Sequence, residues 1–71
     1  VGLIETLATI HYLRGSLLFP SGDVAGCLAQ HARSRDYARQ AGSPQAEARA
    51  QSGLGDAYLL QSRLNSAYAH Y

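Results

Sequence analysis

The sequence predicts an all-α protein made of two antiparallel helical hairpins. Apolar residues recur at steps of three and four along most of the 71-residue chain, and this is the period of an amphipathic helix. The tripeptide Gly42-Ser43-Pro44 marks the end of one helix and the start of the next. No segment shows the alternation of apolar and polar residues that is typical of a half-buried strand.

The first hairpin is expected between residues 3 and 41. Its first helix covers residues 3–19, where the leucines and Ile10 follow the helical period. Pro20-Ser21-Gly22 then breaks this helix, and Asp23 can accept a hydrogen bond from the unpaired amides of a new first turn. The second helix therefore starts near Asp23 and ends at about residue 41.

The second hairpin is expected between residues 43 and 71. Its first helix starts at the Gly-Ser-Pro junction, where Ser43 is a suitable N-cap and the helix dipole favours the carboxylate of Glu47. This helix is predicted to end near a short polar break at residues 62–63. A fourth helix follows the break, and the chain stops inside it. The short loops make each pair of helices antiparallel.

Composition and charge exclude several classes of partner. Six arginines, no lysine and five acidic residues give a net charge of +1. Such a chain has no large positive field, so neither nucleic acid nor a membrane surface is an expected partner. The single Cys27 cannot form an intrachain disulfide, which favours a reducing, cytoplasmic location. Because the chain opens with Val1 and not Met, we expect it to be a segment of a longer protein.

The two hairpins share a pattern of side-chain size at an offset of forty residues. Gly15 aligns with Gly55, and Cys27 aligns with Ala67, so small residues recur at matching places before and after each loop. A repeated helical hairpin produces this pattern, because its helices must approach closely at fixed points. Gly55 is therefore expected at a helix crossing, where only a small residue fits.

These features resemble the tetratricopeptide repeat family, in a long variant with a period near forty. Residues 38–50 look like the junction between two such repeats, and residues 54–58, Leu-Gly-Asp-Ala-Tyr, resemble the family's Leu-Gly-x-x-Tyr motif, with Ala67 after the loop. The resemblance implies a fragment of a right-handed α-solenoid with repeat one at about residues 3–41 and repeat two at about residues 43–71. The sequence departs from the family pattern at four positions, which are Arg14, Leu18, Cys27 and Ser62.

Readings that assign chemistry to single residues are weaker. Cys27, His31 and His11 could hold zinc, but they lack the paired spacing of metal sites. A thiol enzyme based on Cys27 and His31 lacks an identifiable orienting acid. Gly53-Leu54-Gly55 follows no strand, so it is no phosphate loop. We therefore expect no enzyme activity, no metal and no cofactor.

One positive pattern points to binding. If the first helix of each hairpin lines a concave surface, as the family resemblance implies, two stripes with three-four-three spacing face the same groove. The first stripe contains Thr9, Tyr12, Ser16 and Phe19, and the second contains Arg49, Ser52, Asp56 and Leu59. Apolar anchors mixed with polar groups suit a peptide, and they equally suit a solvated helix face.

Two functions remain open. The first is a non-catalytic interaction module that binds a protein or peptide, with a homodimer through the open ends of the solenoid. The second is an intramolecular regulatory segment that packs against a neighbouring domain. The family resemblance implies a setting for the second, because similar Ala- and Arg-rich repeats occur in bacterial signalling proteins that carry a nucleotide cyclase, an ATPase or a transcription regulator.

Overall fold

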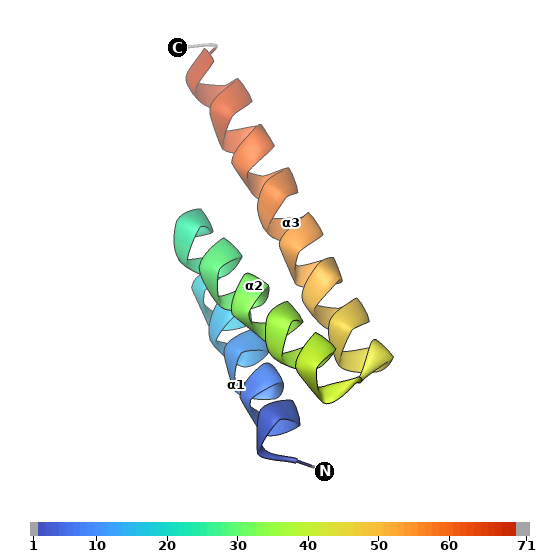
Figure 1. The fold of residues 1–71 in the computed structure, drawn as a ribbon. Helices are drawn as coiled ribbons and strands as arrows, with labels where there is room; N and C mark the ends of the chain where they lie inside the picture. The colour runs from blue at the N-terminus through green and yellow to red at the C-terminus, as the bar shows by residue number, and fades with distance from the viewer. Residues whose placement is uncertain (1, 70–71) are drawn as a thin grey trace.

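The computed structural model describes residues 2–69, except for the side chain of Tyr68. Its three helices are α1 (Leu3–Leu18), α2 (Val24–Ala41) and α3 (Pro44–Ala69) (Figure 1). Residues 2–69 contain no strand, so the predicted all-α class is confirmed. In this range no helix is both long enough and apolar enough to cross a membrane.

The first hairpin forms as the sequence predicts. α1 ends at Leu18, and Gly22 adopts a left-handed backbone with φ of 78° in the turn that follows. The side chain of Asp23 then caps α2 by accepting a hydrogen bond from the backbone N–H of Gly26 at 2.9 Å. Local turn and cap chemistry thus fixes this loop.

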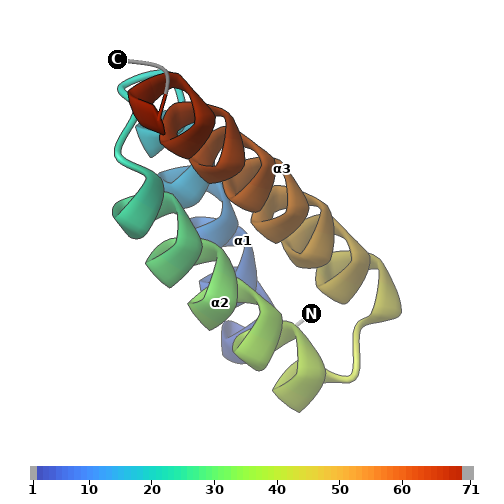
Figure 2. The same ribbon diagram turned by 90° about the horizontal axis from the view of Figure 1, so that it is seen from above.

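The junction between α2 and α3 also matches the prediction. Gly42 adopts φ of 66°, and its N–H donates to the carbonyl groups of Ala38 and Arg39 at the end of α2. Ser43 Oγ accepts a hydrogen bond from the N–H of Ala46 at 3.3 Å, and α3 begins at the next residue. The left-handed glycine reverses the chain, so α3 runs back along the hairpin (Figure 2).

The predicted break at Ser62 and Arg63 is wrong. Helix α3 continues through both residues to Ala69, so residues 2–69 hold one hairpin and a third long helix, without the predicted fourth helix. The physical reason is that Ser62 stands where the first hairpin has Gly22, and Arg favours helix. Without a glycine or proline nothing forces a turn. The last part of α3 therefore projects beyond α1 and α2 (Figure 1).

Small residues form the contacts between the helices. Leu54 is the one large aliphatic residue that is buried within the described part of the chain. Most other buried positions carry small side chains, namely Ala8, Cys27, Ser34, Ala38, Ala46, Ala50 and Ala57. Because these side chains are short, the helix backbones approach each other closely. Larger apolar residues such as Leu17, which is 78% exposed, lie outside this core.

Two side-chain hydrogen bonds fix the register of α1 against α2. Ser34 Oγ donates to the carbonyl oxygen of Ala8 at 2.6 Å, and Cys27 Sγ contacts the carbonyl oxygen of Gly15 at 3.3 Å. The two donors are seven residues apart on α2, and the two acceptors are seven apart on α1. Both contacts are buried, so a slip of one residue would leave their polar groups without partners.

The tightest helix crossing is at His31, not at Gly55. The imidazole ring of His31 lies between Gly15 of α1 and Gly53 of α3, and a Cβ atom at either glycine would come within 2.7 Å of it. Gly55 was expected at this crossing, but it is exposed and a Cβ atom there would meet nothing within 4 Å. The helical rotation of α3 explains the correction, because Gly53 faces α2 and Gly55, two residues later, points away from it.

Alanine substitutions at the two glycines of α3 are expected to change stability in opposite directions. Gly55→Ala should raise the free energy of unfolding by about 0.5 to 1 kcal/mol, because alanine is the better helix former and meets no neighbour. Gly53→Ala should lower it by about 1 to 3 kcal/mol, because the ring of His31 has Gly15 on its other side and cannot move away. Urea unfolding followed by circular dichroism measures both changes.

The double variant Gly53→Ala with His31→Ala serves as the control. It removes the clash, so the loss from Gly53→Ala should be smaller in the His31→Ala background than in the wild type. Equal effects of Gly53→Ala in both backgrounds would contradict the proposed packing of His31.

Candidate functional site

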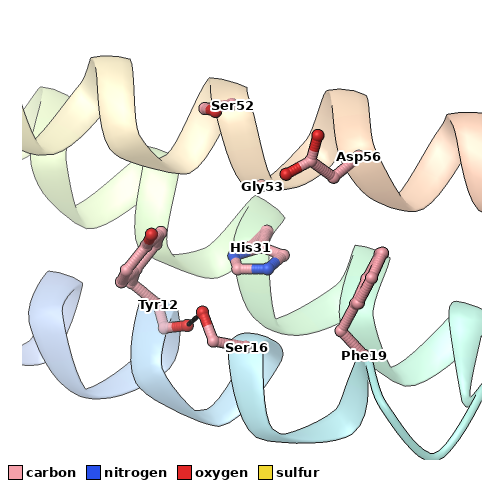
Figure 3. Close-up of a pocket in the computed structure, with 7 residues that line it drawn as sticks. All are labelled: Tyr12, Ser16, Phe19, His31, Ser52, Gly53 and Asp56. Atoms are coloured by element: carbon pink, nitrogen blue, oxygen red, sulfur yellow. Dashed lines mark hydrogen bonds between the residues drawn. The ribbon is translucent and has the colours of Figure 1, made fainter.

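A cavity of about 170 Å³ lies where the three helices meet (Figure 3). Side chains from every helix face it. Its lining consists of Tyr12, Ser16 and Phe19 from α1 and its end, His31 from α2, and Ser52, Gly53 and Asp56 from α3. Figure 3 shows Tyr12 and Phe19 on either side of His31, with Asp56 across from them on α3.

The structure brings five of the eight residues of the two predicted stripes to this cavity. They are Tyr12, Ser16, Phe19, Ser52 and Asp56. Arg49 is not part of the lining, but its guanidinium carbon lies 5.5 Å from the centroid of the Tyr12 ring, in a cation–π contact at the edge of the groove. Thr9 belongs to the predicted stripe of Tyr12, but its hydroxyl donates a hydrogen bond to the carbonyl oxygen of Glu5 in its own helix.

Leu59 lies outside the cavity and is 51% exposed. The next residue on α3, Leu60, is half-buried. It lies on the same side of the helix as Gly53 and Ala57, and this side faces the hairpin. The stripe of residues 49, 52, 56 and 59 was drawn from spacing alone. Spacing fixes which residues share a face but not how far that face is rotated from the neighbouring helices.

Two of the lining residues, His31 and Gly53, were not predicted from the sequence. The sequence patterns singled out His31 only as a candidate zinc ligand or catalytic base, and Gly53 only as part of a phosphate-loop motif that follows no strand. The glycines themselves are the signal in the sequence. A buried ring needs space, and neither Gly15 nor Gly53 has a Cβ atom that would clash with it. Recognising it requires the register of three helices, which the sequence alone does not supply.

The His31 side chain is the most unusual polar group of the site. The residue is 2% exposed, and its Nδ1 atom is buried with no hydrogen-bond partner among residues 2–69. Burial lowers the pKa of His31, because the charged imidazolium loses its hydration, and the carboxylate of Asp56 partly opposes this shift. His31 is therefore a neutral ring at pH 7.

Residue types of a hydrolytic triad line the cavity but do not form one. Ser16 Oγ donates to the carbonyl oxygen of Tyr12 at 3.0 Å, so its hydroxyl is used within its own helix. His31 forms no side-chain hydrogen bond to Ser16, Ser52 or Asp56. A serine nucleophile needs a hydrogen-bonded base, and that base needs an orienting acid. The described residues do not provide this chain of contacts.

The residues considered for zinc are engaged separately. His11 Nδ1 lies 2.7 Å from Gln30 Oε1, and its ring stacks on Tyr37 at a centroid distance of 5.5 Å. Cys27 is fully buried, and burial raises the pKa of its thiol. A protonated, inaccessible thiol is a poor nucleophile and a poor metal ligand. Residues 2–69 contain no group of three candidate ligands close enough to hold a metal ion.

No family model, curated protein sequence or solved structure matches this chain. The resemblance to tetratricopeptide repeats therefore stays a prediction.

Lowering the pH through about 6.5 is expected to reduce the free energy of unfolding. The unfolded chain hydrates the imidazole of His31, whereas burial in the folded chain lowers its pKa. Between these two pKa values the unfolded state binds more protons than the folded state does. The stability that comes from burying a neutral ring is therefore complete above the ordinary pKa, and it is lost as the pH falls towards the lowered pKa. Urea unfolding at several pH values measures the effect.

Two variants test whether His31 is the group that causes this pH dependence of stability. His31→Gln should flatten the dependence of stability on pH, because it removes the titrating ring. Asp56→Asn should steepen it, since the carboxylate opposes the lowering of the His31 pKa. The same slope in the wild type and in His31→Gln would show that another group titrates.

Proposed function

We propose that this chain is a non-catalytic protein-interaction module that binds a peptide segment in the groove between α1 and α3. The observation that carries the proposal is the cavity itself, whose walls combine two aromatic rings with hydroxyl groups and a carboxylate. Such a mixture supplies apolar anchors together with polar groups that orient a ligand. The proposal keeps the predicted repeat arrangement, with α1 and α2 as one repeat and α3 as the first helix of the next.

The size of the cavity favours a peptide side chain over a small-molecule ligand. Pockets for cofactors and drug-sized ligands enclose about 300 to 1,000 Å³. The cavity here holds about 170 Å³ and opens to solvent between α1 and α3, so it accommodates one long side chain. The rest of a bound segment would lie along the open groove, past Arg49 at one end and Phe19 at the other.

Phe19 is expected to supply most of the binding energy. It lines the cavity and is 39% exposed, so part of its ring is free to be covered by a ligand. Buried aromatic anchors dominate the energetics of protein interfaces, whereas charges at the edge mainly set specificity and association rate. Arg49 at the edge of the groove belongs to the second kind.

Phe19→Ser is expected to weaken the binding of a peptide selected on the wild-type module by about tenfold or more, because it removes the exposed anchor. The peptides can be selected from a random display library on the immobilised protein, and fluorescence anisotropy then measures their affinity. Helix content should stay near that of the wild type, since Phe19 lies after the end of α1.

Leu59→Ser is the matched control. It removes a similarly exposed apolar side chain that does not line the cavity, so peptide affinity should change little. If both variants lose affinity equally, or if only Leu59→Ser does, the peptide does not bind in this groove.

A second candidate function is supported by the outer face of α1. Four apolar residues of α1 are exposed, namely Leu3, Ile10, Leu13 and Leu17. They recur at steps of seven, three and four, so they form one apolar stripe along the helix. Such a stripe suits a helix that packs against a neighbouring domain, as in an intramolecular regulatory segment. In an isolated chain it suits a second copy.

The isolated chain is therefore expected to self-associate as its concentration rises, and Leu13→Gln with Leu17→Gln should shift it towards monomer. Sedimentation at increasing concentration measures the assembly. Peptide binding in the groove should survive this double substitution, because neither leucine lines the cavity. Unchanged sedimentation would mean that the α1 stripe is not the contact surface.

A further inference from the structure

We propose that the groove selects a peptide with a positively charged side chain, arginine or lysine, whose charged end pairs with Asp56. The inference rests on the proposed peptide-binding function and specifies the chemistry of the residue that enters the cavity. Four observations support it, namely the free carboxylate, the neutral ring below it, the aromatic walls and the size of the cavity.

Asp56 is an acidic residue at the cavity that has no internal role among the described residues. Asp36 Oδ1 lies 3.4 Å from Arg35 Nε, and Glu47 Oε2 lies 2.8 Å from Arg39 Nε. Asp23 caps α2. Asp56 forms neither a salt bridge nor a side-chain hydrogen bond within residues 2–69, and it lines the groove. A carboxylate with these properties is available to a cationic ligand, and a charge-assisted hydrogen bond is the strongest polar contact it can make.

His31 makes the base of the cavity compatible with a cation. Its burial keeps the ring neutral at pH 7, so it does not repel a positive charge. Its Nδ1 atom is buried and has no hydrogen-bond partner among residues 2–69. A neutral imidazole has one nitrogen that accepts hydrogen bonds and one that donates them, and an ammonium or guanidinium group only donates them. An anionic ligand would instead be repelled by the carboxylate of Asp56.

The aromatic walls fit the same ligand. Tyr12 and Phe19 stand on either side of His31, and aromatic faces attract guanidinium and ammonium groups (Figure 3). Arg49 already places its guanidinium carbon 5.5 Å from the centre of the Tyr12 ring. That contact uses Tyr12 and leaves Phe19 and Asp56 for the ligand. Arg49 does not form a salt bridge with Asp56, so it does not neutralise the site.

The apolar parts of a long cationic side chain also match the cavity. Lysine and arginine bury an aliphatic stem while their charged end stays near polar groups. A cavity of about 170 Å³ between two rings has room for such a stem, with Asp56 and Ser52 at the α3 side to meet the charged end.

Peptide selection on the immobilised wild-type chain provides the test. Peptides chosen from a random display library are expected to be enriched in arginine or lysine at one position. Replacing that residue by citrulline, which keeps the shape of arginine without its charge, should weaken binding about tenfold. In Asp56→Asn the charged and the citrulline peptide should bind equally well. Asp36→Asn, which neutralises an exposed carboxylate of α2 that does not line the cavity, should keep the full preference.

The outcomes separate this inference from the function on which it rests. Peptides that bind in the groove and lose affinity with Phe19→Ser, but show no preference for positive charge, would overturn the inference and leave the binding function standing. A preference that persists in Asp56→Asn, with unchanged circular dichroism, would also overturn it. If no peptide of any charge binds, both proposals fail.

Discussion

The ring of His31 fixes how the three helices lie against one another. It enters from α2 and occupies the space that Cβ atoms would need at Gly15 of α1 and Gly53 of α3. Glycine in the interior of a helix costs stability, so two such residues on facing helices require a compensating gain. Here the gain is a close three-helix crossing around one planar ring. The same crossing sets the spacing between Tyr12 on α1 and Asp56 on α3, and the groove depends on that spacing.

The loops were predictable because their chemistry is local. Asp23 caps α2, Gly42 takes the left-handed backbone after it, and Ser43 caps α3, each through contacts within a few residues of the chain. Such signals do not depend on the rest of the fold. The same is true of the helical period itself. Thus the all-α class, the first hairpin and five of the residues that line the cavity could be predicted from the sequence.

The remaining features depend on tertiary structure. The break at residues 62–63 was inferred by analogy with the first hairpin, but the decisive glycine is missing there, so α3 continues. Gly55 was assigned from its alignment with Gly15 at an offset of forty residues, and Leu59 was assigned from helical spacing. Neither pattern fixes how far a helix is rotated against its neighbours. Gly53 takes the place that Gly55 was expected to hold, and Leu59 lies outside the cavity. The packing role of His31 was not predicted, because it depends on two glycines that lie on other helices.

The alanine-rich core has a thermodynamic consequence. Unfolding a protein raises its heat capacity mainly in proportion to the apolar area that becomes exposed to water. Ala8, Ala38, Ala50 and Ala57 each bury little area, and Leu54 is the one large aliphatic side chain buried in the described part of the chain. The heat-capacity change should therefore be small for the length of the chain. A small value flattens the curve of stability against temperature, so this bundle should resist cold denaturation.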